Sequence, residues 1–119
     1  MIHILDKEWS IIDIPMAIDC RQIYSILKYN NTIPQLVPIK DIGHKPIDGI
    51  DKEDVRYLNA NLNLPAILVR GMRNPVNKPY RMIDGRHRIL KAKENNIPDL
   101  LAYVIEEKQA LKHLQQYIL

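Results

Sequence analysis

The sequence YRMIDGRHRILKA, residues 80–92, is the feature that most restricts how this chain can fold. Tyr80 to Ile83 predicts a strand, and a helix is expected from about Arg86 to Asn95. Only Asp84 and Gly85 separate the two, so the strand must enter the helix through a tight turn. Glycine permits such a turn and lets the backbone come close to a ligand. The sequence therefore predicts a strand–turn–helix unit with its turn at Asp84-Gly85.

The residues of this turn point to an anion. The first N–H groups of a helix have no partner within the helix, and the helix dipole favours negative charge there. Arg86, His87 and Arg88 lie at that same end, where basic side chains oppose the dipole and destabilise the helix unless an anion joins them. Arginine can hold two phosphate oxygens at once. We therefore expect a phosphate group to be bound by Gly85, Arg86, His87 and Arg88.

A surface turn is the alternative interpretation. Its arginines would pair with acidic residues elsewhere in the chain: Asp48, Asp51 or Glu53. Asp84 would then be an ordinary turn aspartate that caps the following helix.

The distribution of charge also favours an anionic partner. The net charge is only +3, but residues 70–93 hold eight basic residues against a single acid, a formal charge of +7. The other nine basic and thirteen acidic residues give −4. Such segregation suggests an anionic partner for the middle of the chain, although a solvated face with counter-charges from elsewhere in the fold would show the same segregation. The candidate accessory residues are Lys45, Lys52, Arg70 and Arg81.

The N-terminal half predicts short elements. The expected elements are strands at 2–5 and 9–14 joined by a DKE turn, a helix from an Asp19 cap to about Tyr29, an edge strand at 36–42 that contains Pro38, a loop at 43–50, and a helix near 52–61 capped by Asp51 with Val55 and Leu58 facing inward.

The C-terminal half predicts three more elements besides the strand–turn–helix unit. They are a strand at 66–70 followed by a loop, a strand at 100–105, and a closing helix at 106–117.

Length and composition indicate one domain. A chain of 119 residues can bury a core without cross-links, and 46% apolar residues are ordinary for a globule. Cys20 is the single cysteine, which fits a reducing cytoplasm, and no apolar run approaches a membrane span. The N-terminus is not that of an export signal, and the four histidines lack zinc-ligand spacing, so no metal site is expected from protein ligands alone.

The order of these elements over residues 36–105 resembles the ParB/sulfiredoxin superfamily, which includes the ParB N-terminal and ParB-like nuclease domains. YRMIDGRHRILKA is similar to the family's strand, glycine, two variable residues, arginine and helical alanine. The resemblance implies an α+β fold with a small mixed sheet, packed helices and a phosphate-binding turn. Residues 1–35 would be an N-terminal extension and residues 106–119 a C-terminal helix.

The family's three activities match this sequence unequally. Sulfiredoxins need a cysteine where Arg86 stands, so their chemistry should be absent. ParB proteins bind CTP and DNA, and Gly85 and Arg88 match their phosphate box, with Ala92 as the packing position. Their second phosphate motif and their helix-turn-helix are not found here.

The third activity is that of ADP-dependent serine kinases, whose Asp-Gly-His-His-Arg box is matched by Asp84, Gly85, His87 and Arg88. A glutamate that these kinases use after their first strand has no match in Gly43-His44-Lys45. The resemblance to the kinases makes Asp84 the candidate general base or Mg²⁺ partner.

The sequence thus predicts a cytoplasmic domain that binds ATP, ADP, CTP or another phosphate ligand, with or without Mg²⁺. Either it is a nucleotide-dependent phosphotransferase or NTPase, or it is a non-catalytic module that binds DNA or a protein. An acidic side chain within reach of the phosphates would favour the enzyme. A continuous basic surface from the turn toward Arg70, Arg73 and Lys78 would favour the module.

Overall fold

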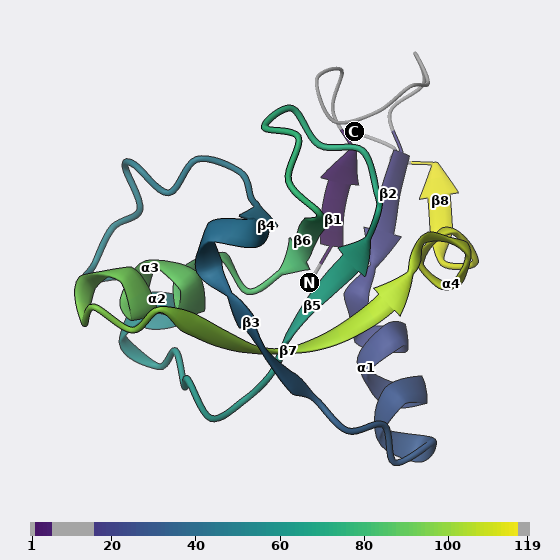
Figure 1. Cartoon of the computed structure of the whole chain (residues 1–119), viewed down its shortest axis with the longest axis horizontal. Helices are drawn as coiled ribbons and strands as arrows, with labels where there is room; N and C mark the ends of the chain where they lie inside the picture. Colours follow the sequence, from purple (N-terminus) through teal and green to yellow (C-terminus); the bar gives the residue numbers. More distant parts are fainter. Residues whose placement is uncertain (1, 6–15, 117–119) are drawn as a thin grey trace.

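The computed structural model of the chain describes residues 2–5 and 16–116 and has an α+β fold built on two sheets (Figure 1). The five-stranded sheet has the order β3-β7-β5-β6-β4, and the three-stranded sheet the order β1-β2-β8. The strands are β1 (Ile2–Leu5), β2 (Met16–Asp19), β3 (Gln35–Pro38), β4 (Ile42–Gly43), β5 (Ala66–Arg70), β6 (Tyr80–Asp84), β7 (Asp99–Glu106) and β8 (Leu114–Gln116). The helices are α1 (Cys20–Tyr29), α2 (Val55–Leu58), α3 (Arg86–Glu94) and α4 (Glu107–Leu111). The predicted α+β class with a small mixed sheet and packed helices is therefore confirmed.

The larger sheet is mixed and curled. β5 pairs in parallel with β7 and antiparallel with β6, while β4 is parallel to β6. β3 and β4 lie at opposite ends of the strand order, yet only the 3₁₀ turn Ile39–Asp41 joins them. Three residues span roughly 10 Å at most, so the sheet must curl until its two edges are close. Figure 1 shows β3 and β4 meeting at that turn.

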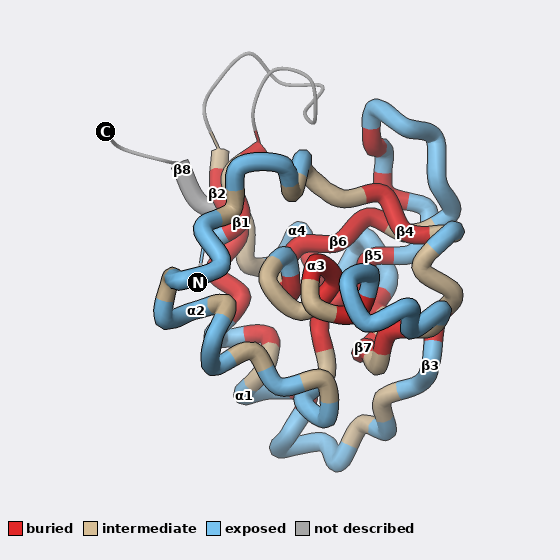
Figure 2. The backbone as a smooth tube through the Cα atoms, turned by 90° about the vertical axis from the view of Figure 1, so that its left-hand side faces the viewer, coloured by how far each residue is buried: buried red, intermediate tan, exposed pale blue. Residues whose placement is uncertain are grey.

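Both faces of the larger sheet are buried, which explains the uninterrupted apolar run of β5. Ile67 and Val69 pack on one side with residues of α1 and β2, whereas Ala66 and Leu68 pack on the other side with α3. A strand covered on both faces needs no alternation of apolar and polar residues. Figure 2 shows the buried backbone concentrated in the central strands and α3.

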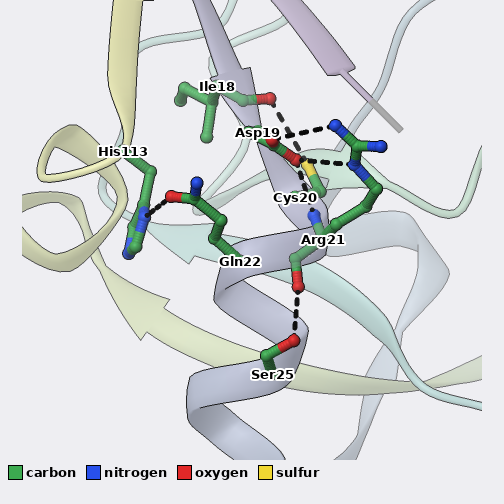
Figure 3. A network of polar contacts seen from close by, with 7 residues as sticks. All are labelled: Ile18, Asp19, Cys20, Arg21, Gln22, Ser25 and His113. Carbon is green, nitrogen blue, oxygen red and sulfur yellow. Dashed lines mark hydrogen bonds and ion pairs between the residues drawn. The ribbon is translucent and has the colours of Figure 1, made fainter.

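Several predicted elements are confirmed. The structure has six elements at the positions predicted from the sequence: β1, β5, β6, β7, α1 and α3. β3 is an edge strand, as expected from Pro38. Asp19 caps α1, since its side chain accepts a hydrogen bond from the Arg21 amide at 3.0 Å (Figure 3). The predicted strand at 9–14 and the DKE turn lie outside the described residues.

Two predicted elements were too long. The strand expected at 36–42 is divided by the Ile39–Asp41 turn directly after Pro38, which has no N–H for the ladder. The helix expected at 106–117 ends at Leu111, because residues 114–116 pair with β2 as β8. Backbone pairing with a sheet edge has thus overridden the helical spacing of the leucines.

The helix expected near 52–61 was wrong in its cap and in its facing. α2 is one turn, Val55–Leu58, and its cap is Asp54. Val55 and Leu58 were expected to face inward, but they are 67% and 59% exposed. Asp51 instead accepts a hydrogen bond from the Glu53 amide, which forms a local turn before the helix.

Candidate functional site: a basic cavity at the start of helix α3

The strand–turn–helix unit has a geometry that only glycine fits well. Gly85 caps α3 with φ +125°, a backbone conformation that other residues rarely adopt. A Cβ atom at this position would lie 2.6 Å from the Cβ of Ala66 on β5. No side chain caps α3, so Asp84 is not the helix cap that was one interpretation of its position. The first N–H groups of α3 therefore lack a side-chain acceptor among the described residues.

A cavity of about 480 Å³ lies beside this turn. Asp84, Gly85 and the first residues of α3 line it on one side. β1 (Ile2 to Ile4) and the segment from Arg56 to Leu64 supply other parts of the lining. The volume lies in the range of small-molecule sites in proteins.

The structure brings the five predicted site residues, Asp84 to Arg88, into this one cavity. Arg86 donates a hydrogen bond from Nε to the Pro46 carbonyl at 2.9 Å. Arg88 donates from Nη1 to the Pro65 carbonyl at 2.9 Å, and only 18% of its side chain is exposed. These bonds fix the direction of both guanidinium groups but leave several of their five N–H donors for other acceptors.

Asp84 is held by two neighbouring side chains, Tyr24 and Arg88. Its Oδ2 accepts a hydrogen bond from the Tyr24 hydroxyl at 2.5 Å and lies 3.9 Å from Nη1 of Arg88. Its side chain is 12% exposed. A carboxylate therefore lies at the same cavity as the basic turn.

His87 contributes a neutral imidazole at neutral pH. Burial and then the nearby charge of Arg56 lower its pKa below the ordinary value. A neutral imidazole can donate one hydrogen bond to an anion without adding a charge. Positive charge at this end of α3 comes from Arg86 and Arg88 instead.

The four accessory candidates lie in different places. Lys45 lines the cavity, where its Nζ donates to the Ile4 carbonyl at 2.7 Å. Lys52 is paired with Glu94 at 2.5 Å, and Arg70 with Glu106 at 3.0 Å. Arg81 is fully buried and donates to His3. Lys52, Arg70 and Arg81 lie outside the cavity lining.

Arg56, His3 and Tyr24 line or support the cavity and were not among the sequence candidates. Arg56 lines the cavity from α2 and pairs with Asp54 at 3.1 Å. This contact, with the Arg56 amide, lowers the pKa of the Asp54 carboxyl to about 2. His3 lines the cavity from β1, and Tyr24 reaches Asp84 from α1. No motif marks them, because they come from parts of the chain that only tertiary folding brings to the turn.

The cavity is positively charged overall. Among the described residues, the charged side chains of the lining are the cations Lys45, Arg56, Arg86 and Arg88 and the carboxylate of Asp84. Neutral histidines add hydrogen-bonding groups, since burial lowers the pKa of His44 as it does that of His87. This balance suits a ligand with more than one negative charge.

The basic residues of 70–81 do not continue this cavity along β6. Gly85 follows the end of β6 that pairs with the start of β5, whereas Arg70 and Tyr80 pair at the opposite end of the hairpin. Arg73 and Lys78 belong to the loop at that far end. Because Arg81 between the two ends is buried and Arg70 is ion-paired, β6 offers no continuous basic path for a polymer.

Cys20 is not a nucleophile in this fold. It is 1% exposed, and its Sγ donates to the Ile83 carbonyl at 3.3 Å. Burial, followed by the charge of Asp84, raises its pKa to about 12. Cys20 is therefore a thiol of the core at neutral pH.

Acid is expected to destabilise the protein through His3. Burial and the charge of Arg81 lower the pKa of His3 to about 3, from 6.5 in an unfolded chain. Between these values the unfolded chain binds a proton that the folded chain does not, so stability is complete above pH 6.5 and falls below it. From pH 7 to pH 5 the free energy of unfolding should fall by about 2 kcal/mol on this account.

Urea unfolding at both pH values, for wild type and His3→Gln, measures this effect. The variant should lose about 2 kcal/mol less than wild type over the same interval. An equal loss in both proteins would show that His3 is not buried as a neutral side chain.

Within residues 2–5 and 16–116, no three histidine, cysteine, aspartate or glutamate side chains gather as a metal site. The helices of these residues also include none that is long and apolar enough to cross a membrane.

Comparisons of the chain with protein-family models, with curated proteins and with solved structures gave no match.

Proposed function

We propose that this protein binds a nucleotide or another phosphate-bearing ligand, with the phosphate groups against Gly85 to Arg88. The observation that carries the proposal is the cavity of about 480 Å³ in which a helix N-terminus without a side-chain cap meets four cationic side chains. Backbone N–H groups, guanidinium groups and the neutral His87 are the donors that phosphate oxygens accept. The α+β fold and the DGRHR turn support membership of the ParB/sulfiredoxin superfamily as part of this proposal.

The function we favour is that of a nucleotide-dependent phosphotransferase or NTPase. The supporting observation is that Asp84 lines the same cavity as the basic turn, which was the feature expected to distinguish an enzyme from a binding module. As a general base, the Asp84 carboxylate would accept the proton of an attacking hydroxyl or water. The absence of a continuous basic path along β6 argues against the DNA-binding alternative.

Mg²⁺ fits this site as a partner of the ligand. Mg²⁺ commonly binds through one or two carboxylates together with substrate phosphates and water. Asp84 is the carboxylate of the cavity lining, so it would hold the ion and the ion would offset phosphate charge. The free thiol of Cys20 in the core suits a protein of the reducing cytoplasm.

A thermal-shift screen of ATP, ADP and CTP, with and without Mg²⁺, tests the proposal. A ligand at 100 times its Kd should add about 2.7 kcal/mol of stability, a rise in Tm on the order of 10 °C for a domain of this size. Arg88→Ala should abolish that rise, measured against the variant's own Tm without ligand. Lys78→Ala, in the loop at the far end of the hairpin, is the matched control and should keep it.

Two results would contradict the proposal. One is an undiminished shift in Arg88→Ala, which would place the ligand elsewhere. The other is the absence of a shift with every nucleotide and with inorganic pyrophosphate, which would remove the phosphate site itself.

A further inference from the structure

The hydroxyl of Tyr24 lies between the two charged side chains of the turn. It donates to Oδ2 of Asp84 at 2.5 Å and accepts from Nη1 of Arg88 at 3.2 Å. The Pro65 carbonyl accepts from the same Nη1 at 2.9 Å and also lies 3.1 Å from the Tyr24 hydroxyl. Since a hydroxyl has one proton, we assign it to the shorter contact, the one with Asp84. Tyr24 comes from α1, so a helix sixty residues away in sequence reaches the phosphate-binding turn.

Without this hydroxyl, Asp84 and Arg88 would be expected to form a direct ion pair. They are four residues apart at the start of a helix and carry opposite charges, and such pairs commonly close to about 2.8 Å. Here Nη1 and Oδ2 are 3.9 Å apart. Burial and the charge of Asp84 raise the pKa of Tyr24, so its hydroxyl stays protonated and remains a donor at neutral pH.

The hydroxyl therefore satisfies both groups separately. Asp84 receives its proton donor from Tyr24, and Arg88 directs Nη1 toward Tyr24 and Pro65. Among the described residues, the contacts of Arg88 use Nη1 alone, which leaves Nε and Nη2 for a ligand in the cavity. Two parallel N–H donors are what a guanidinium group offers to a phosphate.

We propose that Tyr24 is a positioning residue of the phosphate site, whose hydroxyl keeps Arg88 from closing onto Asp84 and so keeps the guanidinium group open to an anion. This inference rests on the proposed function, because it concerns the same cavity. It assigns a binding role to α1, within the N-terminal segment that the family resemblance leaves out. The affinity of the site would then depend on how α1 packs against the larger sheet.

Calorimetric titration with ATP and with inorganic tripolyphosphate tests this role. Tyr24→Phe should bind both probes about tenfold more weakly than wild type, which is the size of loss expected when one hydrogen bond is removed. The ring of Tyr24 packs edge-on against Tyr103, with centroids 6.3 Å apart, and phenylalanine keeps that contact. Tyr29→Phe, on the same helix with 87% of its residue exposed, is the matched control and should bind as wild type does.

A double-mutant cycle separates positioning from a general structural role. If the hydroxyl acts by keeping Asp84 and Arg88 apart, it should matter little once the carboxylate is gone. Asp84→Asn and Asp84→Asn/Tyr24→Phe should therefore bind with affinities within about twofold of each other. A tenfold loss in both backgrounds would overturn the proposal.

A ligand-free crystal structure of Tyr24→Phe gives a second, independent measurement. Nη1 of Arg88 and Oδ2 of Asp84 should approach to about 2.8 Å. A distance still near 3.9 Å, or wild-type affinity in this variant, would refute the role of Tyr24. The proposed phosphate site itself would still stand if Arg88→Ala loses binding. If wild type binds neither probe, the proposed function fails first, and this inference falls with it.

Discussion

Replacing Arg81 by alanine is expected to lower the free energy of unfolding by about 3–5 kcal/mol. Arg81 is fully buried on β6 and donates to Nε2 of His3 at 2.9 Å and to the carbonyl of Arg73 at 3.0 Å. Alanine would leave a void and deprive two acceptors of their donor. The loss should be large because these bonds join β6 to β1 of the other sheet and to the loop before β6.

Arg70→Ala is the control for this experiment. Arg70 ends the neighbouring strand, and its ion pair with Glu106 joins two half-exposed side chains. Such surface pairs contribute at most about 1 kcal/mol. Urea denaturation of the two variants should separate them clearly, and similar losses would show that the burial of Arg81 does not matter for stability.

Gly85→Ala is expected to cost about 2–4 kcal/mol of stability and to weaken ligand binding as well. The new Cβ would meet Ala66 at 2.6 Å, and the backbone would keep a φ of +125° that alanine rarely adopts. Relief of either problem must move the turn, and with it the first N–H groups of α3. Thermal denaturation and the nucleotide screen measure the two effects on the same variant.

Gly71→Ala distinguishes the clash from the backbone strain. Gly71 also has a positive φ, +72°, but a Cβ there would meet nothing within 4 Å. It should cost only about 1 kcal/mol and leave ligand binding intact. If Gly85→Ala is no worse than this control, the close packing against Ala66 is not what requires glycine at the turn.

The sequence predicted the elements that local chemistry controls. The strand–turn–helix unit was expected from Gly85 and the apolar runs around it, and α1 from the cap at Asp19. The placing of Asp84 to Arg88 in one cavity follows, because five consecutive residues at a helix start cannot lie far apart.

What the sequence missed depends on contacts between distant segments. Arg81 was an accessory candidate as one of the basic residues of 70–93, but it is buried against β1, where a neutral His3 accepts from it. Arg56 and Tyr24 carry no motif and reach the turn only through tertiary folding. Residues 114–116 are a further example. Pairing with the edge of β2 makes them a strand, although the spacing of their apolar residues predicted a helix.

The position of β1 has a consequence for how a ligand enters. Among the described residues, β1 pairs only with β2 as the outer strand of the smaller sheet, and its residues Ile2, His3 and Ile4 line the cavity. Outer strands open locally at lower free energy than central ones, and the central strands β5 and β7 do not depend on this pairing. β1 is nevertheless tied to the rest of the fold by side chains, because His3 accepts from the buried Arg81 and the Ile4 carbonyl accepts from Lys45. Opening this wall of the cavity would break both bonds, so a ligand should displace β1 less readily than its outer position suggests.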